Sequence, residues 1–423
     1  MNHHKAPVAI VGLGYVGLPL AELFINGGWE VYGIDIDQSK IDSLLQHKSY
    51  LSDYKDEAIA ELFEHGSFHP CTAFDVISQV KTVILCIPTP LTPEHQPDLR
   101  FLKSAFSNCI PHLQQDQLIV LESSTYPGTT EEVICPVIKF SGYTIGEDFF
   151  IAYSPERIDP GNTSYQLNEI PKLVGGVTKE CTERASEVYE TIFDSVVSVS
   201  SPKVAEMSKL VENSQRLINI SFMNELLLLC EKMDISLWEV IDAASTKPFG
   251  FTPYFPGPGI GGHCIPVDPM YLLWKAGTYQ IDLDLIKWAH QVNERMPYYI
   301  VNKIEEHSEG HSLNGKKILV IGTAYKKNVN DVRESSALKI MKLLQDKGAD
   351  VHYYDPYIPS IKLNACTLKS VELTPETIAE ANLTLIHTDH SSLDYEKIVQ
   401  FSNLVLDTRR VTKANNNKKV ILL

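Results

Sequence analysis

The sequence predicts an α/β protein with two Rossmann-like, doubly wound domains bridged by a central helical layer that contains a long helix. A strand, turn, helix and strand open the chain, and the same plan returns in the last hundred residues. Some thirty residues without Gly or Pro lie between the two copies. At 423 residues the chain has room for two or three domains. We expect them at residues 1–200, 201–312 and 313–423.

The first domain is expected from its βαβ beginning. A strand at 8–11 leads into the turn 12–17, a helix that ends near Asn26, and a strand at 30–35. Apolar runs bounded by turn residues predict further buried parallel strands, and these runs are 83–87, 118–121 and 149–152.

The middle of the chain reads as helical. Residues 203–233 carry apolar positions at helical spacing and predict a long, largely buried helix, and a second helix is expected at 283–307. The long helix is also a candidate dimer interface, which the sequence alone does not distinguish from burial within one chain.

The last segment repeats the opening plan, with a strand at 318–321, a helix at 335–347 and a strand at 350–354. Lys326, Lys327 and Arg333 lie between strand and helix. Loops at the carboxyl ends of parallel strands line the ligand crevice, so this basic loop is placed to bind an anion.

Composition excludes several classes of partner. The formal charge of −16 disfavours nucleic acid and anionic membranes. The eight cysteines show no CxxC pair, no zinc spacing and no dense disulfide pattern, which favours a reducing cytosol and no metal site. Glycines and Pro19 interrupt the apolar N-terminus, so we expect neither a signal peptide nor a membrane span.

The glycine turn GLGYVG predicts a dinucleotide site. It joins a strand to a helix, and Asp35 ends the next strand eighteen residues after Gly17. Glycines let backbone amides approach a pyrophosphate, and a carboxylate accepts hydrogen bonds from the ribose hydroxyls. Asp35 would repel a 2′-phosphate, so NAD is favoured over NADP. The alternative is a tight turn with no ligand.

Cys264 lies in the loop GPGIGGHCIPVD, which is too rich in Gly and Pro for a strand or a helix core. Most single cysteines are inert core residues. Here the glycines allow close approach of a substrate, and Asp268 follows four residues later, so a nucleophilic thiolate is the competing interpretation. A thiolate needs a cationic neighbour, for which Lys209 is the candidate.

Polar residues on the long helix and after predicted strands are further candidates. Lys209, Asn213 and Arg216 form one stripe at i, i+4 and i+7, which is either a solvated face or a functional one. Glu156 and Thr125 follow buried strands and would otherwise simply cap turns. Arg409, after the predicted strand 404–406, is suited to phosphate or is ordinary surface charge.

Together these pieces resemble one family. The segments GLGYVGLPLA, SSTYPGTT, YSPERIDPGN, PGPGIGGHCIPVDPMYL and AYKKNVNDVRESSA are similar to those of NAD-dependent nucleotide-sugar 6-dehydrogenases, over about residues 8–411. The versions of these segments found here look like those of the UDP-N-acetylglucosamine 6-dehydrogenase branch of the family. UDP-N-acetylmannosamine enzymes share GGHCIPVDP, and UDP-glucose enzymes typically carry GGSCF. The resemblance implies cytoplasmic polysaccharide biosynthesis and a homodimer paired through the central helix.

The resemblance also implies roles for residues. It makes Cys264 the nucleophile and assigns Lys209 and Asn213 to the oxyanion, Asp268 to proton handling, and Glu156 and Thr125 to thioester hydrolysis. The implied NAD contacts are Gly12, Leu13, Gly14, Tyr15, Val16, Gly17, Asp35, Thr89, Thr125 and Arg333. The implied contacts of the UDP-sugar are Glu156, Arg157, Lys209, Asn213, Phe255, Pro256, Gly257, Gly261, Tyr325, Lys326 and Arg409.

The expected reaction is a four-electron oxidation of a C6 hydroxyl to a carboxylate. It uses two NAD because each accepts two electrons. Two other functions compete with it. An epimerase would return the hydride, although the first domain has no obvious Tyr-x-x-x-Lys pair, and a non-catalytic sensor would leave Cys264 without a task.

Overall fold

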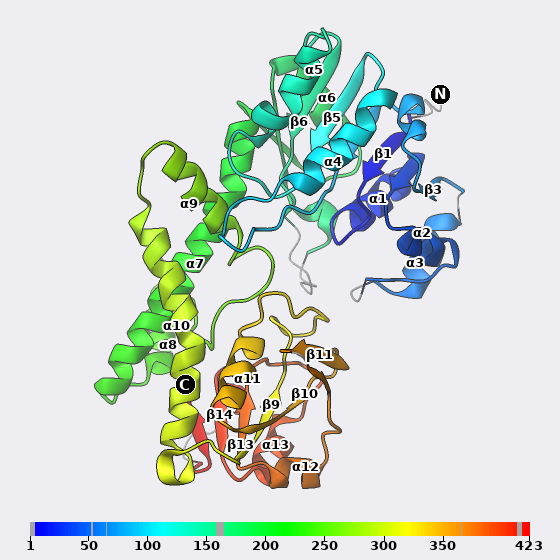
Figure 1. The fold of residues 1–423 in the computed structure, drawn as a ribbon. Helices are drawn as coiled ribbons and strands as arrows, with labels where there is room; N and C mark the ends of the chain where they lie inside the picture. Colours follow the sequence, from blue (N-terminus) through cyan, green and yellow to red (C-terminus); the bar gives the residue numbers. More distant parts are fainter. Residues whose placement is uncertain (1–4, 52–53, 65, 158–164, 365, 413–416) are drawn as a thin grey trace. The chain divides into compact units, whose positions relative to one another are not determined.

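The computed structural model describes residues 5–51, 54–64, 66–157, 165–364, 366–412 and 417–423. The chain divides into two compact units. Unit 1 comprises Met1–Glu212 and Met270–Ile281, and unit 2 comprises Asn213–Pro269 and Asp282–Leu423. The long helix α7, Pro202–Lys232, contributes to both units and is coloured green in Figure 1.

Unit 1 contains an eight-stranded sheet in the order β3-β2-β1-β4-β5-β6-β7-β8. All neighbouring strands are parallel except β6 and β7, which pair antiparallel. The strands are β1 Val8–Val11, β2 Val31–Ile34, β3 Phe68–Cys71, β4 Thr82–Leu85, β5 Gln117–Leu121, β6 Phe149–Tyr153, β7 Lys172–Gly176 and β8 Val196–Val199.

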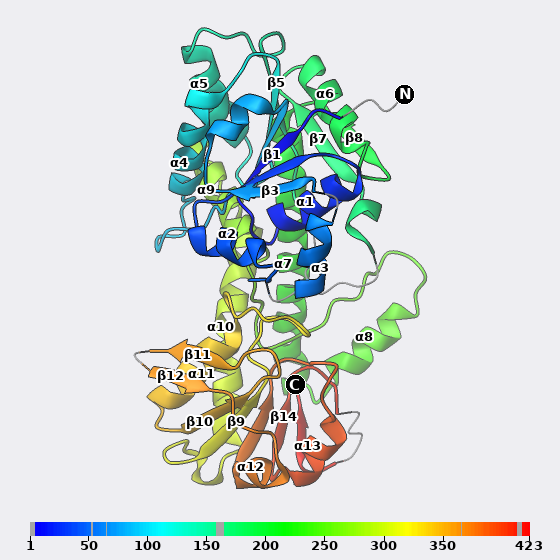
Figure 2. The same ribbon diagram turned by 90° about the vertical axis from the view of Figure 1, so that its right-hand side faces the viewer.

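Helices cover both faces of this sheet, as Figure 2 shows for α4 and α5 on one side and α1 and α6 on the other. The apolar residues of α1, α2, α3 and α6 share one core with alternate residues of the strands. The helices are α1 Gly17–Asn26, α2 Gln38–Leu45, α3 Asp56–Phe63, α4 Arg100–Cys109, α5 Cys135–Phe140 and α6 Lys179–Tyr189, and α9, Asp268–Thr278, lies almost wholly in unit 1.

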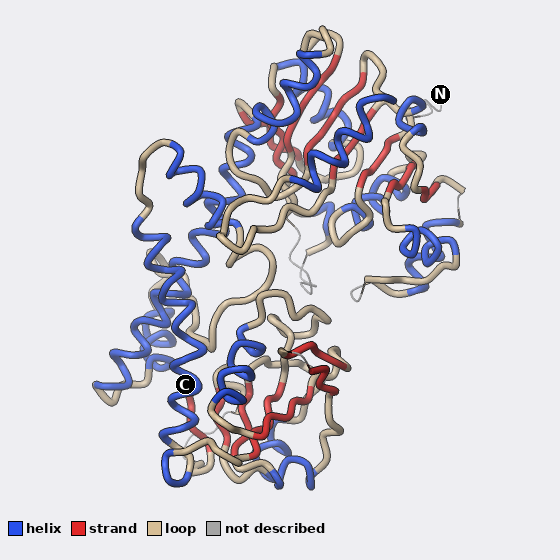
Figure 3. Tube along the Cα trace, in the orientation of Figure 1, coloured by secondary structure: helices blue, strands red, loops and turns tan. Residues whose placement is uncertain are grey.

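Unit 2 has a parallel sheet in the order β10-β9-β13-β14-β15 and a hairpin of β11 and β12 (Figure 3). The strands are β9 Lys317–Ile321, β10 Asp350–Tyr354, β11 Ser360–Leu363, β12 Cys366–Lys369, β13 Leu383–Ile386, β14 Val405–Asp407 and β15 Val420–Leu422. The helices are α8 Leu237–Ser245, α10 Asp284–Glu306, α11 Ser336–Asp346, α12 Pro375–Glu380 and α13 Tyr395–Phe401. The predicted fold class, two Rossmann-like layers with a long central helix, is confirmed.

Only one face of α7 is buried, so the expectation of a largely buried helix was wrong. In its second half, Met223 and Leu227 share an apolar core with Met296 and Ile300 of α10. On the other side of the helix, Phe222 and Leu229 are more than half exposed. Apolar residues on every side of the helix therefore did not mean that every side is buried.

No helix in the described part of the chain is both long and apolar enough to span a membrane. The eight cysteines, all at described positions, form no disulfide.

Candidate active site

The glycine turn of unit 1 joins β1 directly to α1, and its three glycines serve different purposes. Gly12 has a φ of +97°, and a Cβ there would lie 2.3 Å from the Cys86 carbonyl oxygen. A Cβ on Gly17 would lie 1.9 Å from the Gly12 carbonyl oxygen. A Cβ on Gly14 would meet no atom within 4 Å. Gly12 and Gly17 therefore permit the tight turn, and Gly14 leaves the backbone open to a ligand.

The start of α1 fits a phosphate group. Val16 precedes the helix, and no side chain caps the first amides. Uncapped amides at a helix N-terminus bind anions through their N–H groups and the helix dipole. Tyr15 and Val16 are partly exposed, whereas the Leu13 side chain is buried in the core.

Asp35 follows β2 and is fixed against the glycine turn. Its Oδ2 accepts hydrogen bonds from the Leu13 amide at 3.0 Å and from Lys40 Nζ at 2.8 Å, and its Oδ1 accepts one from the Asp37 amide at 3.0 Å. A carboxylate has about four acceptor positions, so Asp35 can still accept from a ribose hydroxyl. The residues of this end of the sheet fit a dinucleotide.

Thr89 and Thr125 are buried near the ends of β4 and β5. Thr89 Oγ1 donates to the Ser124 carbonyl oxygen at 2.5 Å, which ties the two loops together. Thr125 Oγ1 is buried and makes no hydrogen bond with the described residues. A buried hydroxyl normally has a partner, so Thr125 is suited to a bound ligand.

Glu206 of α7 holds the loop that carries Thr125, a role that no motif in the sequence indicated. The buried Glu206 carboxylate accepts from the Gly128 amide at 2.5 Å, from the Thr130 amide at 2.9 Å and from Thr130 Oγ1 at 2.8 Å. Burial raises the pKa of Glu206, and these hydrogen bonds oppose the rise. The loop is thereby tied to α7 one turn before Lys209.

Lys209 and Glu156 come together in unit 1. Lys209 Nζ donates to the Glu156 carbonyl oxygen at 2.8 Å and lies 3.1 Å from its Oε2. Lys209 and Asn213 are only 4% and 7% exposed, so the solvated-face interpretation is wrong for both. Arg216, the third residue of the stripe, is exposed, because the next helical turn presents it away from the core.

Arg157 is bound on the outer side of the same segment. Its guanidinium donates to Glu212 Oε1 at 2.7 Å and to the Pro171 carbonyl oxygen at 2.8 Å. The rest of the YSPERIDPGN motif, residues 158–162, lies outside the described residues.

In unit 2, Asn213 and Asp268 form a buried pair, with Asn213 Nδ2 donating to Asp268 Oδ2 at 2.6 Å. Asp268 is the first residue of α9, and its amide donates to the Cys264 carbonyl oxygen at 2.8 Å. Cys264 itself is partly exposed. The geometry favours an accessible thiol one turn before a buried carboxylate.

The glycine-rich loop of unit 2 packs against the basic loop after β9 and the segment after β14. A Cβ on Gly257 would lie 2.9 Å from Arg409 Nη1, and one on Gly261 would lie 2.9 Å from Tyr325 Cβ. The Gly262 amide donates to the Arg333 carbonyl oxygen at 2.9 Å. Three segments predicted to hold a nucleotide sugar are thus neighbours within one unit.

Side chains around this loop offer an aromatic face and cationic groups. Phe255 is 49% exposed and stacks on Trp238 with ring centroids 5.7 Å apart, while Pro256 is buried. Arg409 Nε donates to the His387 carbonyl oxygen at 2.8 Å, and burial lowers the pKa of its guanidinium. Arg409 is therefore not ordinary surface charge.

The basic loop is partly exposed at Tyr325 and Lys326, as Arg409 is, and exposed at Lys327 and Arg333. The Arg333 guanidinium lies 2.7 Å from Asp331 Oδ2. The resemblance implied an NAD contact for Arg333, and this residue belongs to unit 2.

The fold and these two sites define a class of protein, the NAD-dependent dehydrogenases with a second nucleotide-binding unit. The NAD binding domain of the UDP-glucose/GDP-mannose dehydrogenase family matches residues 6–193. The central domain of that family matches residues 203–295, and its UDP binding domain matches residues 319–414.

Known relatives match along nearly the whole chain. The UDP-N-acetyl-D-mannosamine dehydrogenase of Escherichia coli K12 is 31% identical over 94% of this chain and 96% of its own. This chain is similar in structure to the UDP-D-ManNAc dehydrogenase of Pyrococcus horikoshii, with 28% identity, a TM-score of 0.88 and coverage of 98% of both chains. It is also similar to the UDP-N-acetyl-mannosamine dehydrogenase Cap5O of Staphylococcus aureus, with 31% identity, a TM-score of 0.85 and coverage of 99% of this chain and 97% of that one. The chain belongs to the UDP-glucose/GDP-mannose dehydrogenase family, and its cofactor is NAD.

Proposed function

We propose that this protein oxidises the C6 hydroxyl of a UDP-N-acetylhexosamine to the carboxylate, with two NAD consumed per sugar. The observation that carries the proposal is the partly exposed Cys264 one turn before the buried Asn213–Asp268 pair. Partial exposure alone does not distinguish Cys264 from Cys71, and it is the neighbouring buried carboxylate and amide that a binding module would not need. The proposal keeps the expected division into domains at 1–200, 201–312 and 313–423.

The residues divide the chemistry among them. NAD, when bound, supplies the hydride acceptor for both oxidations. The Cys264 thiolate adds to the C6 aldehyde, the resulting thiohemiacetal is oxidised to a thioester, and water then hydrolyses the C–S bond. Lys209 and Asn213 stabilise the oxyanions, an effect worth about 3–4 kcal/mol per donor. Asp268 handles the proton of the thiol.

The final hydrolysis is assigned to the loops of unit 1. Glu156 takes a proton from the attacking water, and the Thr125 hydroxyl orients that water. Tyr325, Lys326 and Arg409 bind the UDP, so that binding energy far from C6 orients the reacting carbon.

The sugar is proposed to carry a 2-acetamido group. The segment GGHCIPVDP looks like that of the enzymes for UDP-N-acetylhexosamines, and several relatives are UDP-N-acetyl-D-mannosamine dehydrogenases. The overall form of the motifs favours UDP-N-acetylglucosamine, and the names of the relatives favour its C2 epimer, UDP-N-acetylmannosamine. UDP-glucose is the third candidate.

We also propose a homodimer paired through α7. One face of this helix exposes large apolar side chains, with Val211 50%, Phe222 52% and Leu229 55% exposed. A second copy of the same helix would cover this self-complementary stripe, as an isologous interface requires.

The test is to incubate the purified protein with NAD and a panel of UDP-hexoses and count the NADH formed per sugar at 340 nm. The expected count is two for the preferred sugar, and Cys264→Ala should abolish the acid while NAD affinity is unchanged. Cys71→Ala, at the half-buried last residue of β3, is the matched control and should stay active. A count of one or an active Cys264→Ala would falsify the proposal. Interconverting sugars without net NADH would indicate an epimerase, and binding without turnover a sensor.

A further inference from the structure

A second buried ion pair lies beside Glu156, and none of the roles proposed above uses it. Lys172, the first residue of β7, pairs through Nζ with Glu122 Oε1, just after β5. The Tyr189 hydroxyl donates to Glu122 Oε2 at 2.6 Å. Glu122 and Lys172 are 2% and 5% exposed. Two charges taken out of water are costly, so a function for the pair is worth seeking.

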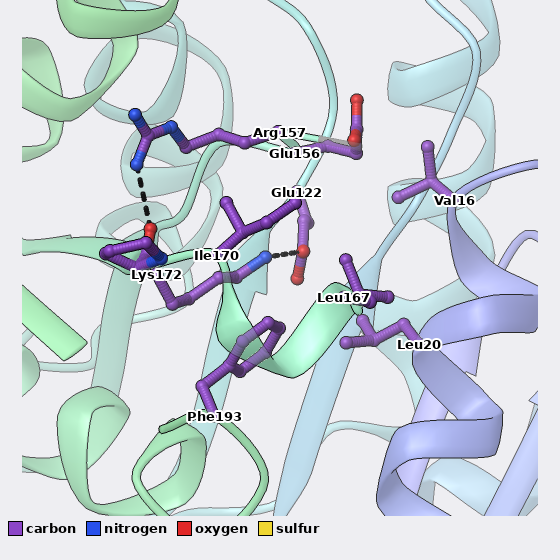
Figure 4. Close-up of a pocket in the computed structure, with 10 residues that line it drawn as sticks. Val16, Leu20, Glu122, Glu156, Arg157, Leu167, Ile170, Lys172 and Phe193 are labelled. Carbon is purple, nitrogen blue, oxygen red and sulfur yellow. Dashed lines mark hydrogen bonds and ion pairs between the residues drawn. The ribbon is translucent and has the colours of Figure 1, made fainter. Parts of the chain in front are cut away.

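A small cavity separates this pair from Glu156 (Figure 4). Its volume is about 10 Å³, roughly the minimum that holds one water molecule. The charged residues that line it are Glu122, Glu156, Arg157 and Lys172. A sugar or a nicotinamide ring is far larger than this space. Any effect of Glu122 and Lys172 on the reaction would therefore pass through Glu156 and not through contact with a substrate in this space.

Each of the two carboxylates that line the cavity has a lysine as its partner, and of these lysines only Lys172 lines the cavity itself. Lys209 holds Glu156, and Lys172 holds Glu122. In Figure 4 the Lys172 ammonium points at Glu122, and the Glu156 carboxylate points away from that pair. Burial raises the pKa of Glu122, and the negative charge of Glu156 across the cavity adds to that rise.

We propose that Glu122 is a positioning residue that keeps Lys172 away from Glu156. The inference rests on the proposed function, in which Glu156 is the base for thioester hydrolysis. Without the Glu122 charge, the buried Lys172 ammonium has Glu156 as the remaining carboxylate on the cavity wall. The attraction between them in a buried site turns Glu156 from Lys209 and from the attacking water.

The step that suffers is hydrolysis alone. In that step the water oxygen bonds to the thioester carbon, one water proton passes to the Glu156 carboxylate, and the C–S bond breaks to restore the Cys264 thiolate. Both oxidations precede it. A slowed hydrolysis therefore leaves two NADH released and the sugar attached to Cys264.

The experiment compares wild type with Glu122→Gln and with the double variant Glu122→Gln/Lys172→Met, using stopped-flow absorbance at 340 nm and intact mass. Wild type must first give two NADH per UDP-sugar, and its failure to do so refutes the proposed function itself. For Glu122→Gln we expect an unchanged burst of two NADH per site, a steady-state rate lowered about 10- to 100-fold, and an acyl adduct on the protein. In the double variant the rate should return to within about 3-fold of wild type.

Controls separate charge from packing. Tyr189→Phe removes one hydrogen bond to Glu122 and keeps the ion pair, so its steady-state rate should stay within about 3-fold of wild type. If Glu122→Gln does not fold, Glu122→Asp, which withdraws the carboxylate by one methylene, should show the same adduct at a smaller loss of rate. Loss of the burst in Glu122→Gln, or a double variant as slow as the single one, overturns the inference.

Discussion

Replacing Gly14 by alanine should weaken NAD binding and leave the fold intact. A methyl group at this position meets no protein atom within 4 Å, and the φ of Gly14 is outside the left-handed region. The free energy of unfolding should therefore change by at most about 0.5–1 kcal/mol, with a gain expected because alanine restricts the unfolded chain. The methyl group does occupy the space through which a pyrophosphate reaches the backbone amides.

The loss of affinity follows from the contacts that the methyl group displaces. A hydrogen bond to a charged group contributes about 1.5–3 kcal/mol, so losing one amide contact to phosphate should raise the Kd of NAD roughly 10- to 100-fold. Isothermal titration calorimetry with NAD gives the affinity, and urea denaturation gives the stability.

Gly17→Ala is the matched comparison for this experiment. Its Cβ would lie 1.9 Å from the Gly12 carbonyl oxygen, so α1 must move and the protein should lose several kcal/mol of stability or fail to fold. If Gly14→Ala bound NAD like wild type, or if it unfolded as readily as Gly17→Ala, the division of roles among the glycines would be wrong.

Two further predictions concern stability. Glu206→Ala should lower the free energy of unfolding, measured by urea denaturation, by about 3–5 kcal/mol because it leaves the Gly128 and Thr130 amides buried without an acceptor. Glu225→Gln, on the exposed part of α7, should lower it by less than about 0.5 kcal/mol. Equal effects of the two substitutions would contradict the buried role of Glu206. Burial holds the pKa of His387 well below its ordinary value of 6.5, so unfolding takes up a proton below that pH. The stability of wild type should then fall by up to about 1.4 kcal/mol per pH unit below pH 6.5 relative to His387→Asn, and parallel pH profiles for the two proteins would contradict the burial of a neutral His387.

Much of the fold could be predicted because its signals are local. The strand at 8–11, the helix to Asn26 and the strand Asp350–Tyr354 lie where the apolar runs and the glycines indicated. The antiparallel strand β7 and the exposed face of α7 were missed. Both depend on which element packs against which, and apolar spacing along one segment does not contain that information.

The candidate site shows the same division. Cys264, Asp268 and the glycine turn stand out by residue type and spacing. Glu206 and Lys172 do not, because each has its partner 50 or more residues away, at Thr130 and Glu122. Glu122 directly follows a buried strand, which was the one local signal for it.

In each Rossmann-like layer one aspartate follows the second strand, and these two residues show most clearly what the sequence alone does not predict. In sequence, Asp35 and Asp355 occupy the same place. In the structure, Asp355 is buried, and its Oδ2 accepts from the Thr323 and Ala324 amides and lies 3.1 Å from His390 Nε2. Asp35 accepts from one turn amide on that oxygen and from Lys40. The sequence by itself determined where a carboxylate stands, and only the tertiary structure decided whether that carboxylate still has an acceptor position for a ribose, because its partners come from distant segments.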